Sequence, residues 1–136
     1  MTTLAELMSR DVVAVAPEDT LGEAAERMSG NDVGSAVVLE HGRLIGILTE
    51  RDLLRAVAGR VHSSEARVRE WMTADPVTAQ EDMTHTEALD TMMEHGFRHL
   101  PVVDGERTLG IVSIRDVMRA DMQATSAARQ GSSESA

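Results

Sequence analysis

The sequence predicts an α/β (α+β) protein made of two βαββα repeats that pack as a pseudo-twofold pair. Residues 4–56 align with residues 68–120 without a gap, at a constant offset of 64, and 16 of the 53 aligned positions are identical. The phrase GILTERD at 46–52 also returns as GIVSIRD at 110–116. A fixed period of this kind indicates a repeated architecture. Because only two copies are present, we expect a closed pair rather than an open array.

Both copies contain the same elements in the same order. A short β-branched run comes first, at 12–15 and again at 77–79. A helix follows, and it begins with the capping-box pattern T-x-x-E at Thr20 and at Thr84. Gly96 is expected to end the second of these helices. Each copy then has two apolar strands joined by a turn (35–39 and 44–48; 99–103 and 109–113) and a closing helix (51–58; 115–122).

These elements divide the chain into two repeats with a linker and a tail. We expect the first repeat over residues 1–60, a linker over 61–67 and the second repeat over 68–122. The remaining segment, 123–136, is rich in small and polar residues, a composition typical of disorder. A unit of about 60 residues buries only ~60% of the surface of its unfolded chain, so the two repeats are expected to need each other.

Charge and composition exclude several classes of partner. The formal net charge is −10, which argues against sequence-independent nucleic-acid binding and against an anionic membrane surface. The chain has no cysteine, so disulfides and thiolate chemistry are excluded. Neither a membrane-spanning apolar run nor a signal peptide is recognisable. We therefore expect a soluble, cytoplasmic protein.

The repeated phrase lies where a strand ends and a helix begins, and it has two interpretations. Thr49 with Asp52, and Ser113 with Asp116, form capping boxes in which aspartate replaces glutamate. The glycine three residues earlier, Gly46 in GILTERD, is costly in a strand unless something approaches it closely. The second interpretation is ligand binding, because a helix N-terminus with a nearby carboxylate can hold the hydroxyls of a ribose. The sequence leaves both open.

The two gapless copies, each with a G-h-h-[ST]-x-x-D phrase after a hairpin, resemble a CBS domain pair, also called a Bateman module. The resemblance covers residues 4–120, and the stretch GFRHLPVVDGERTLGIVSIRDVM is its most specific part. It implies two βαββα units with ligand sites in the cleft between them, and pairs that often dimerise. The known ligands of the family are AMP, ADP, ATP and S-adenosylmethionine.

The resemblance also implies roles for individual residues. The ribose would be held by Thr49 and Asp52 in one pocket, and by Ser113 and Asp116 in the other. Phosphates in the Asp116 pocket would meet basic residues, so we expect a charged nucleotide there. Beside the Asp52 pocket, the residues aligned with Arg98 and His99 are uncharged, and we expect this pocket to take a less charged adenosine or to stay empty. Besides these ribose-binding residues, the expected ligand contacts are Arg98, His99, Arg115, Asp11, Val13, Val33 and Gly34 for the Asp116 pocket, and Asp75, Val77 and Phe97 for the Asp52 pocket.

Each of these residues also has a structural explanation. Arg98 could pair with an acidic neighbour, and His99 could be satisfied by the backbone. Gly34 could be a turn residue, and Phe97 is better explained by the core than by stacking. His95 and His99 have a metal-like spacing, but Gly96 interrupts the helix that would align them, and we expect no metal.

The sequence indicates no enzyme. It contains neither a glycine-rich phosphate loop of the Walker type nor a nucleophile with its local signature. Two functions remain: a regulatory sensor of an adenosine compound that acts on a protein target in trans, and a constitutive dimerisation or interaction protein without ligand binding. The resemblance favours the first and implies a homodimer.

Overall fold

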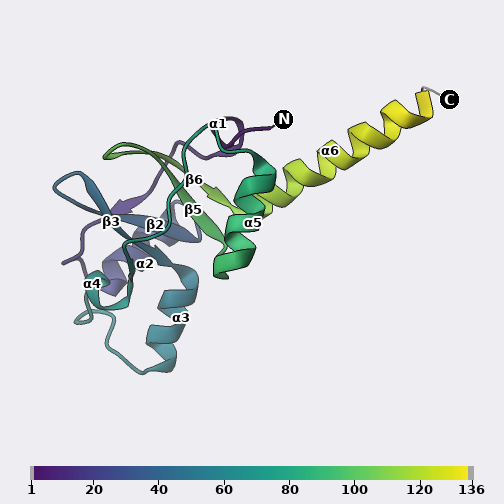
Figure 1. Ribbon diagram of the computed structural model, residues 1–136. Coiled ribbons are helices and arrows are strands. Elements are labelled where there is room, and N and C mark those ends of the chain that lie inside the picture. The colour runs from purple at the N-terminus through teal and green to yellow at the C-terminus, as the bar shows by residue number, and fades with distance from the viewer. Residues whose placement is uncertain (1, 135–136) are drawn as a thin grey trace. The chain divides into compact units, whose positions relative to one another are not determined.

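The computed structural model describes the backbone of residues 2–134 and the side chains of residues 2–126. The chain contains both helices and strands, in mixed order along the sequence (Figure 1). The first half contains α1 (Leu4–Leu7), β1 (Ala14–Val15), α2 (Leu21–Gly30), β2 (Ser35–Glu40), β3 (Arg43–Thr49) and α3 (Glu50–Ala58). The second half contains α4 (Val68–Trp71), β4 (Thr73–Ala74), α5 (His85–His95), β5 (His99–Asp104), β6 (Arg107–Ser113) and α6 (Ile114–Glu134). The predicted mixed class and the order of the main elements are confirmed.

The chain forms two compact units, and each unit contains parts of both sequence repeats. Unit 1 consists of residues 1–10, 78–104 and 109–136, and unit 2 of residues 11–77 and 105–108. The first ten residues therefore belong with the second repeat, and α4 and β4 belong with the first. The repeat boundaries at residues 60 and 68 describe the sequence period and differ from these structural boundaries.

The sheets of the two units follow one plan. In unit 2 the strand order is β1-β2-β3-β4, with β1 parallel to β2 and the other pairs antiparallel. In unit 1, β5 pairs with β6, and single bridges extend this ladder on both sides, from Val102 to Ala79 and from Ile111 to Ser9. Ala79 and Ser9 lie 64 positions from Val15 and Thr73, so the bridges stand where unit 2 has β1 and β4.

A proline explains why the strand expected at 77–79 is reduced to a single bridge. In unit 2 the amide of Val37 donates to the carbonyl of Val13 at 2.9 Å, which helps to hold β1 against β2. The residue equivalent to Val37 is Pro101, which has no amide hydrogen to donate. Only the hydrogen bonds of Ala79 remain, to Pro101 at 2.9 Å and from Val103 at 2.9 Å.

The strand glycines of the repeated phrase receive a neighbouring segment of the chain. A Cβ atom at Gly110 would lie 2.6 Å from the carbonyl oxygen of Ser9 and 2.8 Å from the sulfur of Met8. A Cβ atom at Gly46 would lie 2.5 Å from the sulfur of Met72. The sequence predicted a close approach at these glycines, and the approaching group is the chain itself. The glycines are therefore explained by packing, and they give no support to the ligand interpretation of the phrase.

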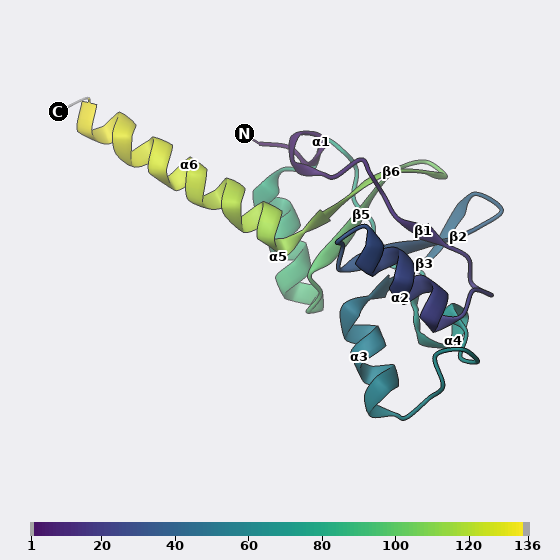
Figure 2. The ribbon, with the colours of Figure 1, turned by 180° about the vertical axis from the view of Figure 1, so that it is seen from behind.

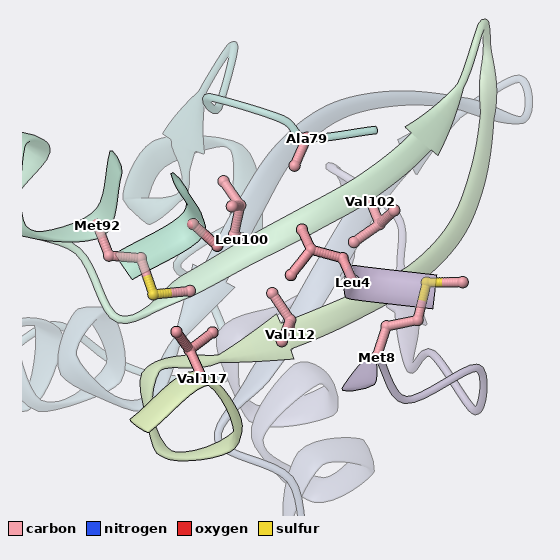
Figure 3. Close-up of a cluster of buried hydrophobic side chains, with 9 residues drawn as sticks. Leu4, Met8, Ala79, Met92, Leu100, Val102, Val112 and Val117 are labelled. Carbon is pink, nitrogen blue, oxygen red and sulfur yellow. The ribbon is translucent and has the colours of Figure 1, made fainter. Parts of the chain in front are cut away.

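Each unit has its own aliphatic core. In unit 1 the buried side chains of α1, β5, β6 and α6 meet around Leu4, which is fully buried (Figure 3). In unit 2, α2 buries Leu21, Ala24 and Met28, which lie on one face of the helix because of their helical spacing. Figure 2 shows α2 and α3 with the strands of this unit. Val68 of α4 is fully buried in the second core, at the position equivalent to Leu4.

A charged cluster fixes α4 within unit 2. Arg69 donates to Glu18 at 2.9 Å and to Glu40 at 2.7 Å. These hydrogen bonds with Glu18 and Glu40 raise the pKa of Arg69 further above its usual value. The guanidinium is exposed to solvent, so the ion pairs contribute little to stability and act mainly to orient the segment.

The helix ends agree with the sequence in part. Gly96 ends α5 in the left-handed region, with φ of 74°, as predicted. Thr20 accepts the amide hydrogen of Glu23, and Thr84 that of Glu87, but the glutamates do not complete the predicted boxes by bonding back.

The prediction of a disordered tail from residue 123 is wrong for the part that the structure describes. The closing helix α6 continues to Glu134, well past the expected end at 122, and its second half extends away from α5 (Figure 1). The composition argument weighed the lack of apolar residues and neglected the helix propensity of alanine, glutamine, methionine and arginine. Residues 135–136 of the predicted tail lie outside the described residues.

We expect the substitution Gly110→Ala to lower the free energy of unfolding by about 1–3 kcal/mol, because the new methyl group would collide with the backbone of Ser9. Gly30→Ala is the matched control. It adds the same atom at the end of α2, where nothing lies within 4 Å, and should be neutral or stabilising by about 0.4–1 kcal/mol. Urea unfolding followed by circular dichroism measures both, and equal stability of the two variants would contradict the close approach.

Candidate functional site

The candidate site is the junction of strand and helix, which occurs once in each unit. Thr49 is the last residue of β3 and the N-cap of α3, and Ser113 is the last residue of β6 directly before α6. The aspartate of each phrase lies three residues later, in the first helical turn. Strand and helix together therefore fix the hydroxyl and the carboxylate side by side.

The first junction is a complete capping box. The carboxylate oxygen Oδ2 of Asp52 accepts hydrogen bonds from the Thr49 amide at 2.9 Å and from the Thr49 hydroxyl at 3.1 Å. The Asp52 amide donates to the Thr49 hydroxyl oxygen at 3.3 Å. Asp52 is buried, with 6% of its surface exposed. The capping interpretation of Thr49 and Asp52 is therefore confirmed.

The second junction repeats this geometry with serine in place of threonine. Asp116 Oδ2 accepts from the Ser113 amide at 3.1 Å and from the Ser113 hydroxyl at 2.8 Å. The Asp116 amide donates to Ser113 Oγ at 3.2 Å. Asp116 is only partly buried, so its carboxylate is the more accessible of the two.

Each cap uses only one of the two carboxylate oxygens of its aspartate. In both boxes the hydrogen bonds fall on Oδ2, so Oδ1 takes no part in the cap. A carboxylate oxygen has room for two hydrogen bonds, and it is a natural acceptor for a pair of neighbouring hydroxyls. The box also holds the aspartate in one position before any ligand arrives, which lowers the entropic cost of binding. Capping and hydroxyl binding are therefore compatible at the same residue.

One carboxylate, that of Glu50, stands beside the first junction, and Arg51 follows it on α3. The amide of Glu50 donates to the carbonyl of Gly34 at 3.0 Å, which brings the start of β2 against the start of α3. Ser35 pairs with Thr49 across β2 and β3 and is buried, with 7% of its surface exposed. The exposed carboxylate of Glu50 lies over Gly34, where a Cβ atom would be 3.2 Å from Oε1. Sequence analysis missed Glu50, although its counterpart in the aligned repeat is the uncharged Ile114.

The surroundings of the second junction are basic. The amide of Ile114 donates to the carbonyl of Arg98 at 2.8 Å, so Arg98 stands at the position of Gly34. Arg115 follows directly on α6, and both arginines are exposed. No carboxylate within 4.0 Å pairs with either arginine among the side chains that the structure describes. His99, half-buried, is the first residue of β5. The structure thus places the backbone of Arg98 next to the start of α6, where Ser113, Arg115 and Asp116 lie.

The remaining candidate residues are divided between the units. Val13 and Val33 are partly buried and pack against the core of unit 2, and Phe97 does the same in unit 1. Phe97 also contacts the ring of His95, with centroids 5.4 Å apart, in agreement with a core role. The residues that remain are exposed and belong to unit 2: Asp11, Asp75 and Val77. The predicted pockets draw residues from both units, and their assembly stays a prediction.

Metal binding and membrane insertion are two further properties on which the described residues bear. Among the described residues, no group of three or more histidine, cysteine, aspartate or glutamate side chains could hold a metal ion. Within the same part of the chain, each helix is too short or too polar to cross a bilayer.

The chain matches a known family over most of its length. The family model described as the CBS domain matches twice, at residues 4–59 and 68–123. A 17.7 kDa protein of Acidianus ambivalens, itself uncharacterized, is 40% identical over 121 residues, which are 88% of this chain and 73% of that protein.

Solved structures of similar proteins include ligand complexes. A CBS domain protein of Pyrobaculum aerophilum complexed with AMP has a TM-score of 0.78 and 30% identity, over 84% of this chain and 88% of that one. The CBS domain pair of protein MJ0100, in complex with 5′-methylthioadenosine and S-adenosyl-L-methionine, has a TM-score of 0.82 and 26% identity. That similarity covers 91% of this chain and 98% of that chain.

The capping boxes predict coupled stability effects. We expect Thr49→Ala and Asp52→Ala each to cost about 1 kcal/mol of unfolding free energy, because each removes half of the box. The double variant should cost less than the sum, with a coupling energy of about 0.5 kcal/mol or more, since the residues share their hydrogen bonds. A double-mutant cycle from urea unfolding measures this coupling.

Glu23→Ala is the matched control for this cycle. Glu23 occupies the same position in α2, but its carboxylate does not return a hydrogen bond to Thr20. The substitution should change the stability by less than about 0.5 kcal/mol. Strictly additive effects of Thr49→Ala and Asp52→Ala would contradict a shared box.

Proposed function

The chain belongs to the CBS-domain family, and on that premise we propose that it is a regulatory module that binds an adenosine-containing small molecule. Binding changes its conformation or its assembly, and a partner protein responds to the change. The module itself carries out no reaction. The ligand class is AMP, ADP, ATP or S-adenosylmethionine, and the ligand acts as a signal rather than as a cofactor.

One observation carries the proposal: each unit holds an aspartate at a helix N-terminus with one oxygen outside the cap. In this arrangement Asp52 and Asp116 accept ribose hydroxyls through Oδ1 while Oδ2 remains bound to the cap. The hydroxyls of Thr49 and Ser113 stand beside them. The AMP and S-adenosylmethionine complexes of similar proteins support the choice of adenosine.

The basic residues favour a phosphorylated ligand at Asp116. Arg98 and Arg115 offer planar guanidinium groups, which bind phosphate in a bidentate manner, and His99 adds a further donor. An arginine that is already paired with a carboxylate is less available to bind phosphate. Among the described side chains, neither Arg98 nor Arg115 forms an ion pair. We assign the charged nucleotide to this site, with the phosphates directed toward Arg98.

Exposed apolar side chains favour self-association as the second part of the function. Leu54 and Val57 on α3 are 68% and 72% exposed, and Met93 on α5 is 71% exposed. On α6, Met118 and Met122 are 50% and 70% exposed and lie one helical turn apart. Large apolar side chains clustered on exposed helices mark interaction surfaces. We propose a homodimer that uses these helices.

Regulation requires that the ligand prefer one state of the protein. A ligand shifts a conformational equilibrium only by its differential affinity for the two states. The alternative function, constitutive dimerisation without a ligand, uses the same helix surfaces and needs neither aspartate for binding. The sensor function therefore predicts ligand binding that is lost in an aspartate variant, whereas constitutive dimerisation predicts no ligand binding.

We expect AMP or ATP to stabilise the protein against heat. At 100 times its Kd, one bound ligand adds about 2.7 kcal/mol, which corresponds to a rise in Tm on the order of 10 °C for a chain of this size. Asp116→Ala should abolish the rise, because the ribose acceptor is lost. Differential scanning fluorimetry with AMP, ADP, ATP, S-adenosylmethionine and GTP measures the effect, with each variant compared with its own ligand-free Tm.

Ser126→Ala, a substitution of an exposed residue on α6 outside both sites, is the control and should keep the full ligand effect. If no adenosine compound raises the Tm of the wild-type protein, after any co-purified ligand is removed by unfolding and refolding, the sensor function is rejected.

The dimer also has a direct test. We expect Met122→Glu to shift the protein from dimer to monomer, because a carboxylate would be buried without a partner in the interface. Ala124→Glu adds the same charge on another face of α6 and should leave the dimer intact. Light scattering coupled to size-exclusion chromatography reports the mass, and a wild-type monomer at high concentration would contradict self-association.

A further inference from the structure

The two junctions share one backbone contact but differ in the charge beside it. The amide of residue 50 or 114 donates to the carbonyl of residue 34 or 98, at 3.0 Å and 2.8 Å. In unit 2 this contact brings Glu50 against Gly34, and in unit 1 it brings Ile114 against Arg98. The local formal charge thus changes from −1 for Glu50 with Gly34 to +1 for Ile114 with Arg98.

The carboxylate of Glu50 lies where a side chain at residue 34 would begin, and Arg98 is the residue at the aligned position of the other unit. A Cβ atom at Gly34 would lie 3.2 Å from Oε1 and 3.5 Å from Oε2 of Glu50, so a longer side chain at residue 34 would have to displace the carboxylate. Glu50 is exposed and makes no ion pair or side-chain hydrogen bond among the described residues. Its charge is therefore not neutralised by a partner among the described side chains.

The other charges near the two junctions do not cancel this difference. Arg51 on α3 corresponds to Arg115 on α6, and Arg55 corresponds to Arg119, so each helix carries the same two arginines. Asp52 and Asp116 are likewise matched. The contrast between the junctions therefore rests on the exchange of Glu50 and Gly34 for Ile114 and Arg98, together with half-buried His99 where unit 2 has Ser35.

We propose that Glu50 determines the ligand class of the Thr49–Asp52 site: an adenosine whose 5′ substituent is neutral or cationic, such as a thioether or a sulfonium. This inference rests on the proposed function, because it assumes that Asp52 holds the ribose. A phosphate at the 5′ position would lie near a carboxylate, and like charges at close range strongly weaken binding. A sulfonium would be attracted to the same carboxylate. One chain thereby carries two sites for two adenosine compounds of opposite charge.

The test uses variants with a single intact site. Asp116→Ala leaves the Asp52 site, and isothermal titration compares AMP, adenosine and S-adenosylmethionine. We expect AMP to bind at least about tenfold more weakly than adenosine, and Glu50→Gln in this background to raise the ratio of AMP to adenosine affinity about tenfold. Glu50→Asp keeps the charge and should keep the ratio. In the reciprocal experiment, Ile114→Glu in an Asp52→Ala background should lower the ratio about tenfold at the Asp116 site.

The outcomes distinguish this inference from the proposed function. If both single-site proteins fold, as their circular dichroism would show, and neither binds any of the three compounds, then both ideas are rejected. If Asp116→Ala binds AMP as tightly as adenosine, and Glu50→Gln leaves the ratio unchanged, only the role of Glu50 is overturned. Should Asp116→Ala not fold, Asp116→Asn serves in its place, because asparagine retains an acceptor for the cap.

Discussion

Each unit depends on one close contact, in which the segment that follows α1 or α4 packs against a glycine in a strand. We call this the leading segment, because it lies at the start of a repeat. Met8 and Ser9 lie against Gly110 in unit 1, and Met72 and Thr73 lie against Gly46 in unit 2. The adjoining helices α1 and α4 add Leu4 and Val68, both fully buried, to the two cores. Because each segment forms the start of one repeat and completes the unit of the other, neither repeat contains a full core of its own. Each repeat therefore needs the other to complete its core, as expected for repeats of about 60 residues, which alone bury too little surface.

The same architecture fixes the chemistry at the strand ends. The glycine lets the leading segment pack against β3 or β6, and three residues later the strand ends in a threonine or serine that caps the next helix. The aspartate of the box is held by two donors, so its position does not depend on a ligand. A residue required for stability can thus serve in binding, and its presence in both repeats is not by itself proof of either role. The position of Oδ1, outside the cap, is what gives the binding role its physical basis.

The two junctions show how a duplicated motif can diverge. Their hydrogen-bond geometry is nearly identical, and their immediate charges have opposite sign. All 13 basic residues are arginine, and the net charge is −10. Among the described side chains, only Arg27, Arg43 and Arg69 form ion pairs with carboxylates, so an arginine without such a pair is the common case. The proposal that Arg98 and Arg115 bind an anion rests on their position beside Ser113 and Asp116. The carboxylate of Glu50 beside Asp52 is the basis for the proposed reverse preference at the first junction, on the same backbone.

The sequence by itself determined the mixed α/β class, the period of 64, the helix starts at Thr20 and Thr84, the end of α5 at Gly96 and the caps formed by Thr49 with Asp52 and by Ser113 with Asp116. These features depend on local chemistry, namely caps, turns and apolar spacing, which a single chain segment specifies. Only the tertiary structure decided what approaches the glycines, which repeat receives α1 and α4, why Pro101 shortens a strand, and that Glu50 lies over Gly34. These depend on contacts between segments far apart in the sequence, for which no local pattern exists. The helix from 123 to 134 was missed for a different reason, because low hydrophobicity outweighed helix propensity in the sequence argument.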